Sequence, residues 1–247
     1  MTHVLDIAGL HKRFDGVPVL AGLDLALARG DIFGLIGPNG SGKSTLLDLI
    51  CGADRADAGT VCLAGRDLAG VPAWRRVRLG IGRCFQDSRL WSEMTAGEHL
   101  LTVSESVPRL QNQPTIDDLA ATIGLSREVL GMRPPGLNLL QRRRLELTLA
   151  AFLGSQLLLL DELGSGLDIE QAHQLYDCVV RLLQRGCIGA VVMVEHRMEL
   201  VAAHAGAVGL LQEGRLRRAG REDRSRFESV MHGLVEPAKQ PTKEMRP

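Results

Sequence analysis

The sequence predicts an α/β fold built around a parallel β-sheet, and three observations support this prediction. A glycine-rich loop, Gly37–Ser44, lies between an apolar run and a helical pattern. A second apolar run, Leu157–Leu160, ends in two carboxylates, Asp161 and Glu162. Short apolar runs in the second half of the chain alternate with helical segments, which is the spacing of a parallel sheet with helical crossovers.

The amino-acid composition is that of a globular protein with enough apolar residues for a buried core. Of the 247 residues, 45% are hydrophobic, and lysine plus arginine equal aspartate plus glutamate at 29 each. No net charge therefore favours nucleic acid, and an aromatic content of 3% disfavours base stacking. The five cysteines lack Cys-x-x-Cys spacing, which fits reduced thiols in a cytosolic protein better than disulfides or a zinc site.

The first part of the chain is expected to form strands that lead into the glycine-rich loop. It alternates short apolar runs with turns, and these runs are 4–7, 17–20, 23–27 and 32–36. After the loop, Thr45–Ile50 has a helical pattern that ends near Gly52. The following segment, Gly59–Gly65, is typical of a short strand closed by a glycine turn.

The loop reads Gly-Pro-Asn-Gly-Ser-Gly-Lys-Ser, which matches the phosphate-binding pattern G-x-x-x-x-G-K-S. Glycines let backbone N–H groups point at anionic oxygens, and the following helix adds its positive dipole end. We expect Lys43 to reach the β- and γ-phosphates of a nucleotide and the Ser44 hydroxyl to bind Mg²⁺. The alternative is a glycine-rich turn without a ligand. The cradle residues are Gly37, Pro38, Asn39, Gly40, Ser41, Gly42, Lys43, Ser44 and Thr45.

The chain changes character between residues 88 and 151, where helical patterns are interrupted by prolines. Helices are expected over 96–104, 116–123 and 141–152, which make a mainly helical insertion in the α/β core. Further strands of the parallel sheet are expected at 81–85, 157–160 and 190–194.

No segment is expected to enter or cross a membrane by itself. The N-terminus lacks a basic stretch followed by an apolar core, and the longest apolar runs are far below the roughly 18 residues of a transmembrane helix. The polar segment 236–247 is punctuated by prolines and is expected to be a disordered tail.

The carboxylates after Leu157–Leu160 are expected at the carboxyl end of a buried strand, where α/β sheets bind ligands. Asp161 would hold the Mg²⁺ of Mg-ATP, directly or through water, and Glu162 would orient and polarise the attacking water. The alternative is that these acids are an N-cap of the following helix.

These motifs occur in the order and spacing found in the ATP-binding subunits of ABC transporters, which the chain resembles over about residues 4–235. The match includes the glycine-rich loop, Gln86, the acidic pair, Gly164–Asp168 and Val194–His196. Segments 85–95, 141–146 and 195–201 resemble the importers of branched-chain amino acids, urea and amides most. The resemblance implies an ABC-type P-loop NTPase domain over residues 1–235, with an N-terminal antiparallel β subdomain and a helical subdomain inserted at about 88–151.

The resemblance also implies roles for single residues. Phe14 would stack on adenine, Gln86 would touch Mg²⁺ and move with the membrane partner, and His196 would bond the γ-phosphate. Asp168 would belong to the loop that crosses to the second subunit of a dimer. The alternatives are ordinary packing for Phe14 and a plain surface histidine for His196. Lys43, Glu162 and His196 would be catalytic, and Ser44, Gln86 and Asp161 would bind the metal.

One stretch departs from the family pattern. Where the family has a signature loop, usually Leu-Ser-Gly-Gly-Gln, this chain has Leu137-Asn-Leu-Leu-Gln141. In the family this loop closes over the γ-phosphate bound to the opposite subunit, so branched side chains are expected to impede it. Loss of one or two preorganised donors costs about 3–4 kcal/mol, or roughly 10²–10³ in rate. The alternative is that Asn138 and the main chain still bind phosphate.

Because the weakened signature acts on the partner's nucleotide, the sequence favours a heterodimer with a second ABC ATP-binding subunit. We expect a cytoplasmic ATPase, peripheral on the membrane, that powers import of an amino acid, urea or amide through integral membrane permeases, without nucleic acid. The permease contact is expected near Gln86, Leu90, Trp91 and Met94. For Leu90, Trp91 and Met94 the alternative role is core packing. The rival functions are an ATP-gated regulatory or scaffold subunit with little turnover and, less favoured, a nucleic-acid repair ATPase.

Overall fold

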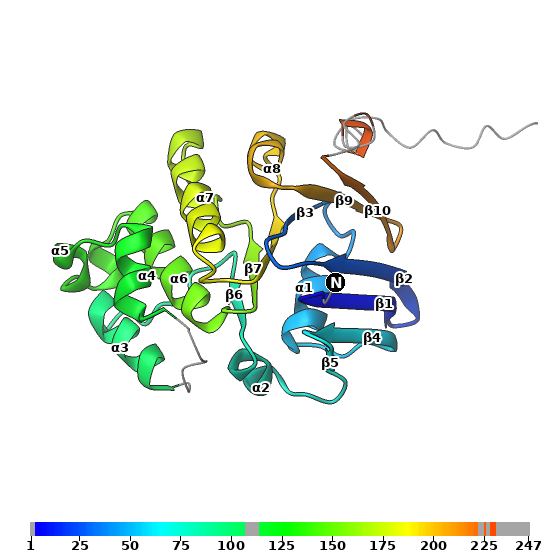
Figure 1. Ribbon diagram of the computed structural model, residues 1–247, viewed down its shortest axis with the longest axis horizontal. Helices are drawn as coiled ribbons and strands as arrows, with labels where there is room; N and C mark the ends of the chain where they lie inside the picture. The colour runs from blue at the N-terminus through cyan, green and yellow to red at the C-terminus, as the bar shows by residue number, and fades with distance from the viewer. Residues whose placement is uncertain (1–2, 107–113, 222–224, 226–227, 231–247) are drawn as a thin grey trace, which may run out of the picture.

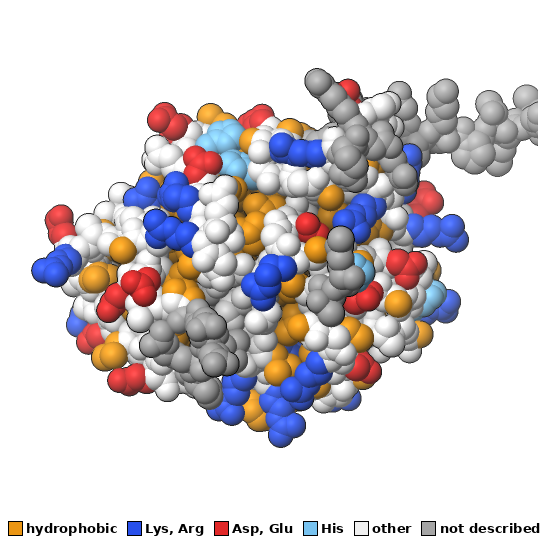
Figure 2. Space-filling model, in the orientation of Figure 1, with side chains coloured by type: hydrophobic (Ala, Val, Ile, Leu, Met, Phe, Trp, Pro, Cys, Tyr) orange, Lys and Arg blue, Asp and Glu red, His pale blue; other side chains and the backbone are white. Residues whose placement is uncertain are grey.

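The computed structural model describes residues 3–106, 114–221, 225 and 228–230, and it contains two β-sheets and several helices (Figure 1). The tail expected at 236–247 lies outside these residues. Within the described ranges, no helix combines the length and the apolar character that crossing a bilayer requires. On the face that Figure 2 shows, basic and acidic side chains are interspersed.

The first sheet is antiparallel, with the strand order β2-β1-β4-β5. Along β1, Leu5, Ile7 and Leu10 are buried, so one face of the sheet packs on the core. The runs expected at 17–20 and 23–27 form a single strand, because the pairing with β1 absorbs Gly22 as an irregularity in register. The strands are β1 (Leu5–Phe14), β2 (Val17–Leu27), β4 (Ala58–Leu63) and β5 (Arg66–Asp67).

The second sheet has the order β10-β9-β3-β8-β7-β6 and is parallel apart from the β9–β10 pair. Three of its strands, β3, β7 and β8, are buried at every residue, which explains their continuous apolar sequences. The strands are β3 (Ile32–Ile36), β6 (Ile81–Cys84), β7 (Leu157–Asp161), β8 (Ala190–Val194), β9 (Ala207–Gln212) and β10 (Arg215–Gly220).

Helices cover the second sheet on both faces. Helix α1 (Lys43–Cys51) lies between the two sheets, since Leu46 and Ile50 belong to an apolar cluster shared with β1, β2, β3 and β7. The other face is covered by α7 (Ile169–Gln184) and α8 (Met198–His204), which bury Tyr176 and Leu200 against it. This layering directs the carboxyl ends of β3, β7 and β8 to one edge, beside the start of α1.

The helices of the middle segment gather at one end of the molecule, on the left of Figure 1. They form an apolar cluster of their own, which includes Leu100, Val129 and Leu145. Helix α6 also carries Phe152 into the main core, so it joins the helical end to the second sheet. The elements are α3 (Ala96–Ser106), α4 (Ile116–Ile123), α5 (Arg127–Leu130), the 3₁₀ helix η1 (Pro134–Gly136) and α6 (Leu139–Leu153).

Several further elements were not expected from the sequence, and three of them are described here. Strands β9 and β10 form a hairpin beside β3, and helix α2 (Ala73–Arg78) precedes β6. In α2 the Arg76 side chain is buried, and its guanidinium donates to the backbone carbonyls of Leu49, Ile50, Leu68 and Val71. Helix α2 is therefore held in place by carbonyls outside the helix, and the local sequence pattern does not indicate these contacts.

Candidate functional site

A cavity of about 630 Å³ opens where the carboxyl ends of the parallel strands meet the start of α1. Residues from both sheets and from five separate chain segments contribute to it. Ten of its twelve lining residues are among the site residues predicted from the sequence. The lining residues are Phe14, Val19, Asn39, Gly40, Gly42, Lys43, Ser44, Thr45, Gln86, Glu162, Val194 and His196.

The loop between β3 and α1 forms the floor of this cavity. Gly42 is the N-cap of α1 and has φ 102°, and a Cβ there would lie 2.8 Å from Val19 Cγ1, so only glycine fits. The Oγ of Ser41 is buried without a hydrogen-bond partner among the described residues. Backbone N–H groups at a helix start beside an unpaired buried hydroxyl suit a phosphate group.

The Lys43 side chain lies across the loop. Its Nζ donates to the carbonyl oxygens of Gly37 at 2.7 Å and Pro38 at 3.0 Å. Burial lowers the pKa of the Lys43 ammonium, while the charges of Glu162 and Asp161 act in the opposite direction. A partly desolvated ammonium at the head of a helix is a favourable partner for an anionic ligand.

Glu162 is the point where three separate segments meet. Its Oε1 lies 2.7 Å from His196 Nε2, and its Oε2 accepts a hydrogen bond from Gln86 Nε2 at 2.9 Å. The residue has φ 52°, which is rare outside glycine, and its N–H donates to Val194 O at 3.0 Å. The strained backbone points the carboxylate into the cavity, with both oxygens held by neighbours.

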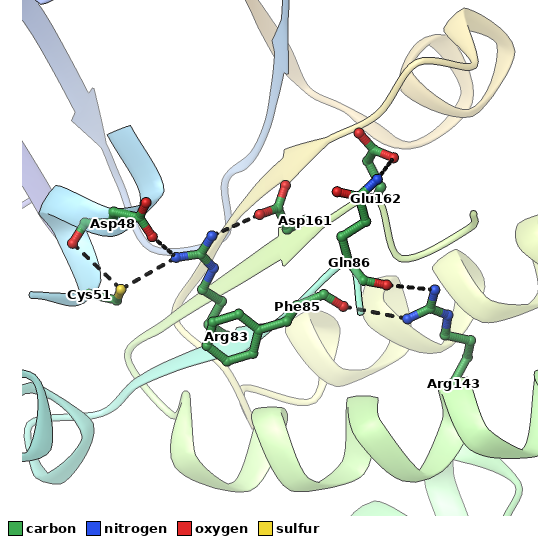
Figure 3. A network of polar contacts seen from close by, with 8 residues as sticks. All are labelled: Asp48, Cys51, Arg83, Phe85, Gln86, Arg143, Asp161 and Glu162. Atoms are coloured by element: carbon green, nitrogen blue, oxygen red, sulfur yellow. Dashed lines mark hydrogen bonds and ion pairs between the residues drawn. The ribbon is translucent and has the colours of Figure 1, made fainter. Parts of the chain in front are cut away.

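Asp161, one residue earlier, is placed differently: its carboxylate does not line the cavity. Its Oδ2 accepts from Arg83 Nη2 at 2.8 Å, and the same guanidinium donates to Asp48 on α1 and to Cys51 Sγ (Figure 3). Arg83 therefore joins the helix after the loop to the acidic end of β7. No local pattern indicates a role for Arg83, because its partners Asp48 and Asp161 lie 35 and 78 positions away in the chain.

Replacing Arg83 by methionine is expected to lower the free energy of unfolding by about 3 kcal/mol. Both the Arg83 and Asp161 side chains are more than 90% buried, so removal of the guanidinium leaves a buried carboxylate without its cation. Urea denaturation of the two proteins measures the difference. Arg75→Met, an exposed arginine on α2, is the matched control, and equal midpoints for the Arg83 variant and the wild type would contradict the expectation.

The acidic pair is not the N-cap of the helix that follows it. The N-cap of α7 is Asp168, whose Oδ1 accepts from the N–H of Gln171 at 2.8 Å. His196 is 46% exposed in its side chain but is bonded to Glu162, and Phe14 is 46% exposed with its ring at the cavity. The Nζ of Lys12 lies 4.8 Å from the centre of that ring.

The stretch Leu137–Gln141 lies outside the cavity lining, at the start of α6. Asn138 is the N-cap, and it exchanges hydrogen bonds of 2.9 Å with Gln141 in a capping box. Leu139 is 40% exposed, whereas Leu140 packs on the main core. One turn later, Arg143 donates to the carbonyls of Phe85 and Gln86 (Figure 3).

The apolar residues after Gln86 have mixed environments. Trp91 is 57% exposed, and its ring stacks on His99 with 5.6 Å between ring centres. Leu90 is partly buried against the helical cluster, and Met94 is half-buried. Core packing thus accounts in part for Leu90 and Met94, and it does not account for Trp91.

The two-sheet fold, the phosphate cradle at α1 and the carboxylates at the end of β7 define a P-loop ATPase domain. Val19 and Val194, which were not among the predicted site residues, also line its cavity. Within this class the chain belongs to the ABC transporter family, whose model matches residues 20–164. The predicted α/β fold with an antiparallel β subdomain is confirmed.

Curated relatives carry names of importers. The chain is 34% identical over 224 residues to an Fe(3+) ions import ATP-binding protein of Rhodococcus jostii, covering 89% of this chain and 63% of the relative. It is 31% identical over 223 residues to a sulfate/thiosulfate import ATP-binding protein of Mycobacterium tuberculosis, covering 89% and 62%. A ribose import ATP-binding protein of Rubrobacter xylanophilus is 32% identical, covering 87% and 44%. The chain thus spans less than two thirds of these relatives.

Solved structures share the fold. A nucleotide-free ATP-binding cassette from an ABC transporter has a TM-score of 0.82 at 23% identity, covering 95% of this chain and 99% of that one. The ADP conformation of another cassette has a TM-score of 0.80 at 24% identity, covering 96% of each chain. The relatives named above import iron, sulfate or ribose, so the narrower resemblance to amino-acid and urea importers stays a prediction.

Proposed function

We propose that this chain binds Mg-ATP in the cavity at the start of α1 and hydrolyses it, as the ATP-binding subunit of an ABC transporter whose permeases are separate chains. The observation that carries the proposal is the meeting of Gln86, Glu162 and His196 opposite Lys43 and Ser44. The cavity thus combines a phosphate cradle with a held carboxylate, which are the two parts that hydrolysis of a phosphoanhydride needs.

Nucleotide binding is assigned to the loop and the first sheet. The backbone N–H groups of 39–45 and the Lys43 ammonium would bind the phosphates, and the exposed Phe14 ring at the cavity would stack on adenine. Ser44 and Gln86, which line the cavity, would hold Mg²⁺, because hydroxyl and amide oxygens are ligands that this ion accepts. Asp161, whose carboxylate is bonded to Arg83 outside the cavity lining, would reach the ion through water. When bound, the ion would neutralise charge on the β- and γ-phosphates.

Glu162 is assigned as the group that accepts a proton from the attacking water. A general base must be held within hydrogen-bond distance of that proton, and both oxygens of Glu162 are fixed by neighbours. His196, which bonds Oε1, would stabilise the γ-phosphate and keep the carboxylate in position. In this assignment the base, Glu162, follows β7, and the hydrogen-bond donor to the γ-phosphate, His196, follows the neighbouring strand β8.

The solute and the permease contact are inferred from sequence motifs and from one exposed aromatic side chain. The motifs at 85–95, 141–146 and 195–201 support an amino acid, urea or amide as the solute. Exposed Trp91, next to Gln86, supports a permease contact at this surface and a position at the cytoplasmic side of the membrane. The ATP-binding domain would comprise residues 1–235, with its helical subdomain at about 88–151.

The exposed Leu139 supports a heterodimer with a second ATP-binding subunit. A branched side chain at the head of α6 keeps another chain's phosphate away from the helix N-terminus, whereas glycine would admit it. In a heterodimer one site would combine this chain's cavity with an intact signature from the partner. The same observation favours a second candidate, an ATP-gated regulatory subunit with little turnover.

Steady-state ATPase activity of the purified chain, alone and mixed with candidate partner ATP-binding subunits, tests the proposal. We expect ATPase activity to rise by about 10²-fold on mixing with the right partner, because the partner's signature loop supplies hydrogen-bond donors to the γ-phosphate. Full activity of the chain alone would contradict the heterodimer. ATP binding without turnover in any mixture would favour the regulatory subunit.

A further inference from the structure

His196 is flanked by two charged residues that turn away from the cavity toward the same glycine. Glu195 is only 3% exposed, and its Oε1 accepts hydrogen bonds from the backbone N–H of Gly164 at 2.9 Å and from the Tyr176 hydroxyl at 2.6 Å. Burial, reinforced by the charge of Glu195, raises the pKa of Tyr176 well above its ordinary value. Tyr176 therefore stays protonated and remains a donor to Glu195.

Arg197 holds the other side of the same turn. Its Nη2 donates to Gly164 O at 2.6 Å, and its Nη1 donates to Leu167 O at 3.1 Å. A Cβ at position 164 would lie 2.6 Å from Arg197 Nη2 and 3.1 Å from Glu195 Oε1, so the turn is enclosed by these two side chains. Both backbone polar groups of Gly164 are thus bonded to the immediate neighbours of His196.

The turn that they hold begins at Glu162. The rare backbone conformation of Glu162, with φ 52°, persists only where surrounding contacts enforce it. Leu163 and Leu167 are buried, so apolar packing already keeps this turn in the core. Packing alone is non-directional, whereas the hydrogen bonds to Gly164 fix the orientation of the peptide planes that follow Glu162.

We propose that Glu195 and Arg197 are positioning residues, which hold the turn 163–167 so that the Glu162 carboxylate faces the cavity and His196. This inference rests on the proposed ATPase function. The hydrogen bonds of Arg197 also connect the end of β8 to Leu167, the residue before Asp168, which is expected to approach a second subunit. Neither side chain touches the cavity, so both act through Gly164 and not on the nucleotide.

Kinetics of four variants in the active ATPase assembly test the proposal. Glu195→Ala removes the acceptor and is expected to lower kcat at least tenfold, while the Kd for a fluorescent ATP analogue stays within about twofold. Glu195→Gln keeps an oxygen that can accept both hydrogen bonds, so it should restore kcat to within about threefold of the wild type. Tyr176→Phe, which removes one donor, should give an intermediate kcat. Glu199→Ala changes an exposed carboxylate on the first turn of α8 and should behave as wild type.

Amide hydrogen exchange of 163–168 gives a readout that does not need turnover. We expect these amides to exchange at least tenfold faster in Glu195→Ala than in the wild type, with the exchange of β7 unchanged. A wild-type kcat or wild-type exchange in folded Glu195→Ala would overturn the proposal. If that variant does not fold, wild-type kcat and exchange in Tyr176→Phe would overturn it. A wild type that binds ATP without hydrolysing it would refute the ATPase function and leave the exchange test decisive.

Discussion

Replacing Glu162 by glutamine is expected to lower the kcat of ATP hydrolysis by about 10²–10⁴, the contribution of a positioned general base. Glutamine has nearly the same shape, so the cavity and the turn after β7 should persist. It cannot accept a proton from water, however, and its amide group would face donors on His196 and Gln86. The affinity for ATP should stay within about twofold, because the phosphate cradle is unchanged.

Single-turnover hydrolysis and equilibrium ATP binding separate these two effects. Glu213→Gln is the matched control, because Glu213 is also a non-glycine residue with positive φ, 51°, but lies at the exposed turn between β9 and β10. The control should retain wild-type kcat. An unchanged kcat in Glu162→Gln would show that another group accepts the proton, and it would favour a regulatory subunit whose turnover comes from elsewhere.

Removing the bulky side chain at the N-terminus of α6 is expected to have the second largest effect on ATPase activity. The double substitution Asn138→Ser and Leu139→Gly should raise the ATPase activity of the chain alone by up to about 10²-fold, because it restores close approach of backbone donors to phosphate. Serine remains an N-cap, and the exposed Leu139 contributes little packing. Leu140 is left in place because it packs on the main core.

Steady-state ATPase assays of the chain alone measure this gain. Leu101→Gly is the control, since Leu101 is a similarly exposed leucine at the surface of another helix, α3, and its loss should not raise activity. The absence of a gain in the double variant would mean that Asn138 and the main chain already bind phosphate. The case for a heterodimer would then lose its main support.

The interior of the fold could be predicted because its sequence signals are local. Strands β3 and β8 coincide with the apolar runs 32–36 and 190–194, since strands buried on both faces need continuous apolar residues. Helix α4 coincides with 116–123, where Thr115 and Asp118 form a capping box. The hairpin of β9 and β10 was missed because β10 is largely charged and depends on pairing with its neighbour.

In the site, too, features with a local sequence signal could be predicted, and features that depend on distant contacts could not. The cradle follows from one contiguous motif, and six of its nine residues line the cavity. Arg83 and Glu195, in contrast, act through partners that lie tens of positions away in the chain. A single sequence does not reveal that a buried guanidinium will meet Asp161, or that a glutamate beside His196 will hold Gly164. Such contacts follow from strand order, which only the folded chain supplies.

The position of β6 at the edge of the second sheet affects how the molecule can move. Among the strands that the structure describes, β7 alone pairs with β6, so local opening of 81–84 breaks one ladder of backbone hydrogen bonds and leaves the pairing of β7, β8 and β3 intact. Gln86 continues directly from this strand, and Arg143 ties it to α6. Through these hydrogen bonds, a displacement of α6 would move Gln86 together with the segment that follows β6.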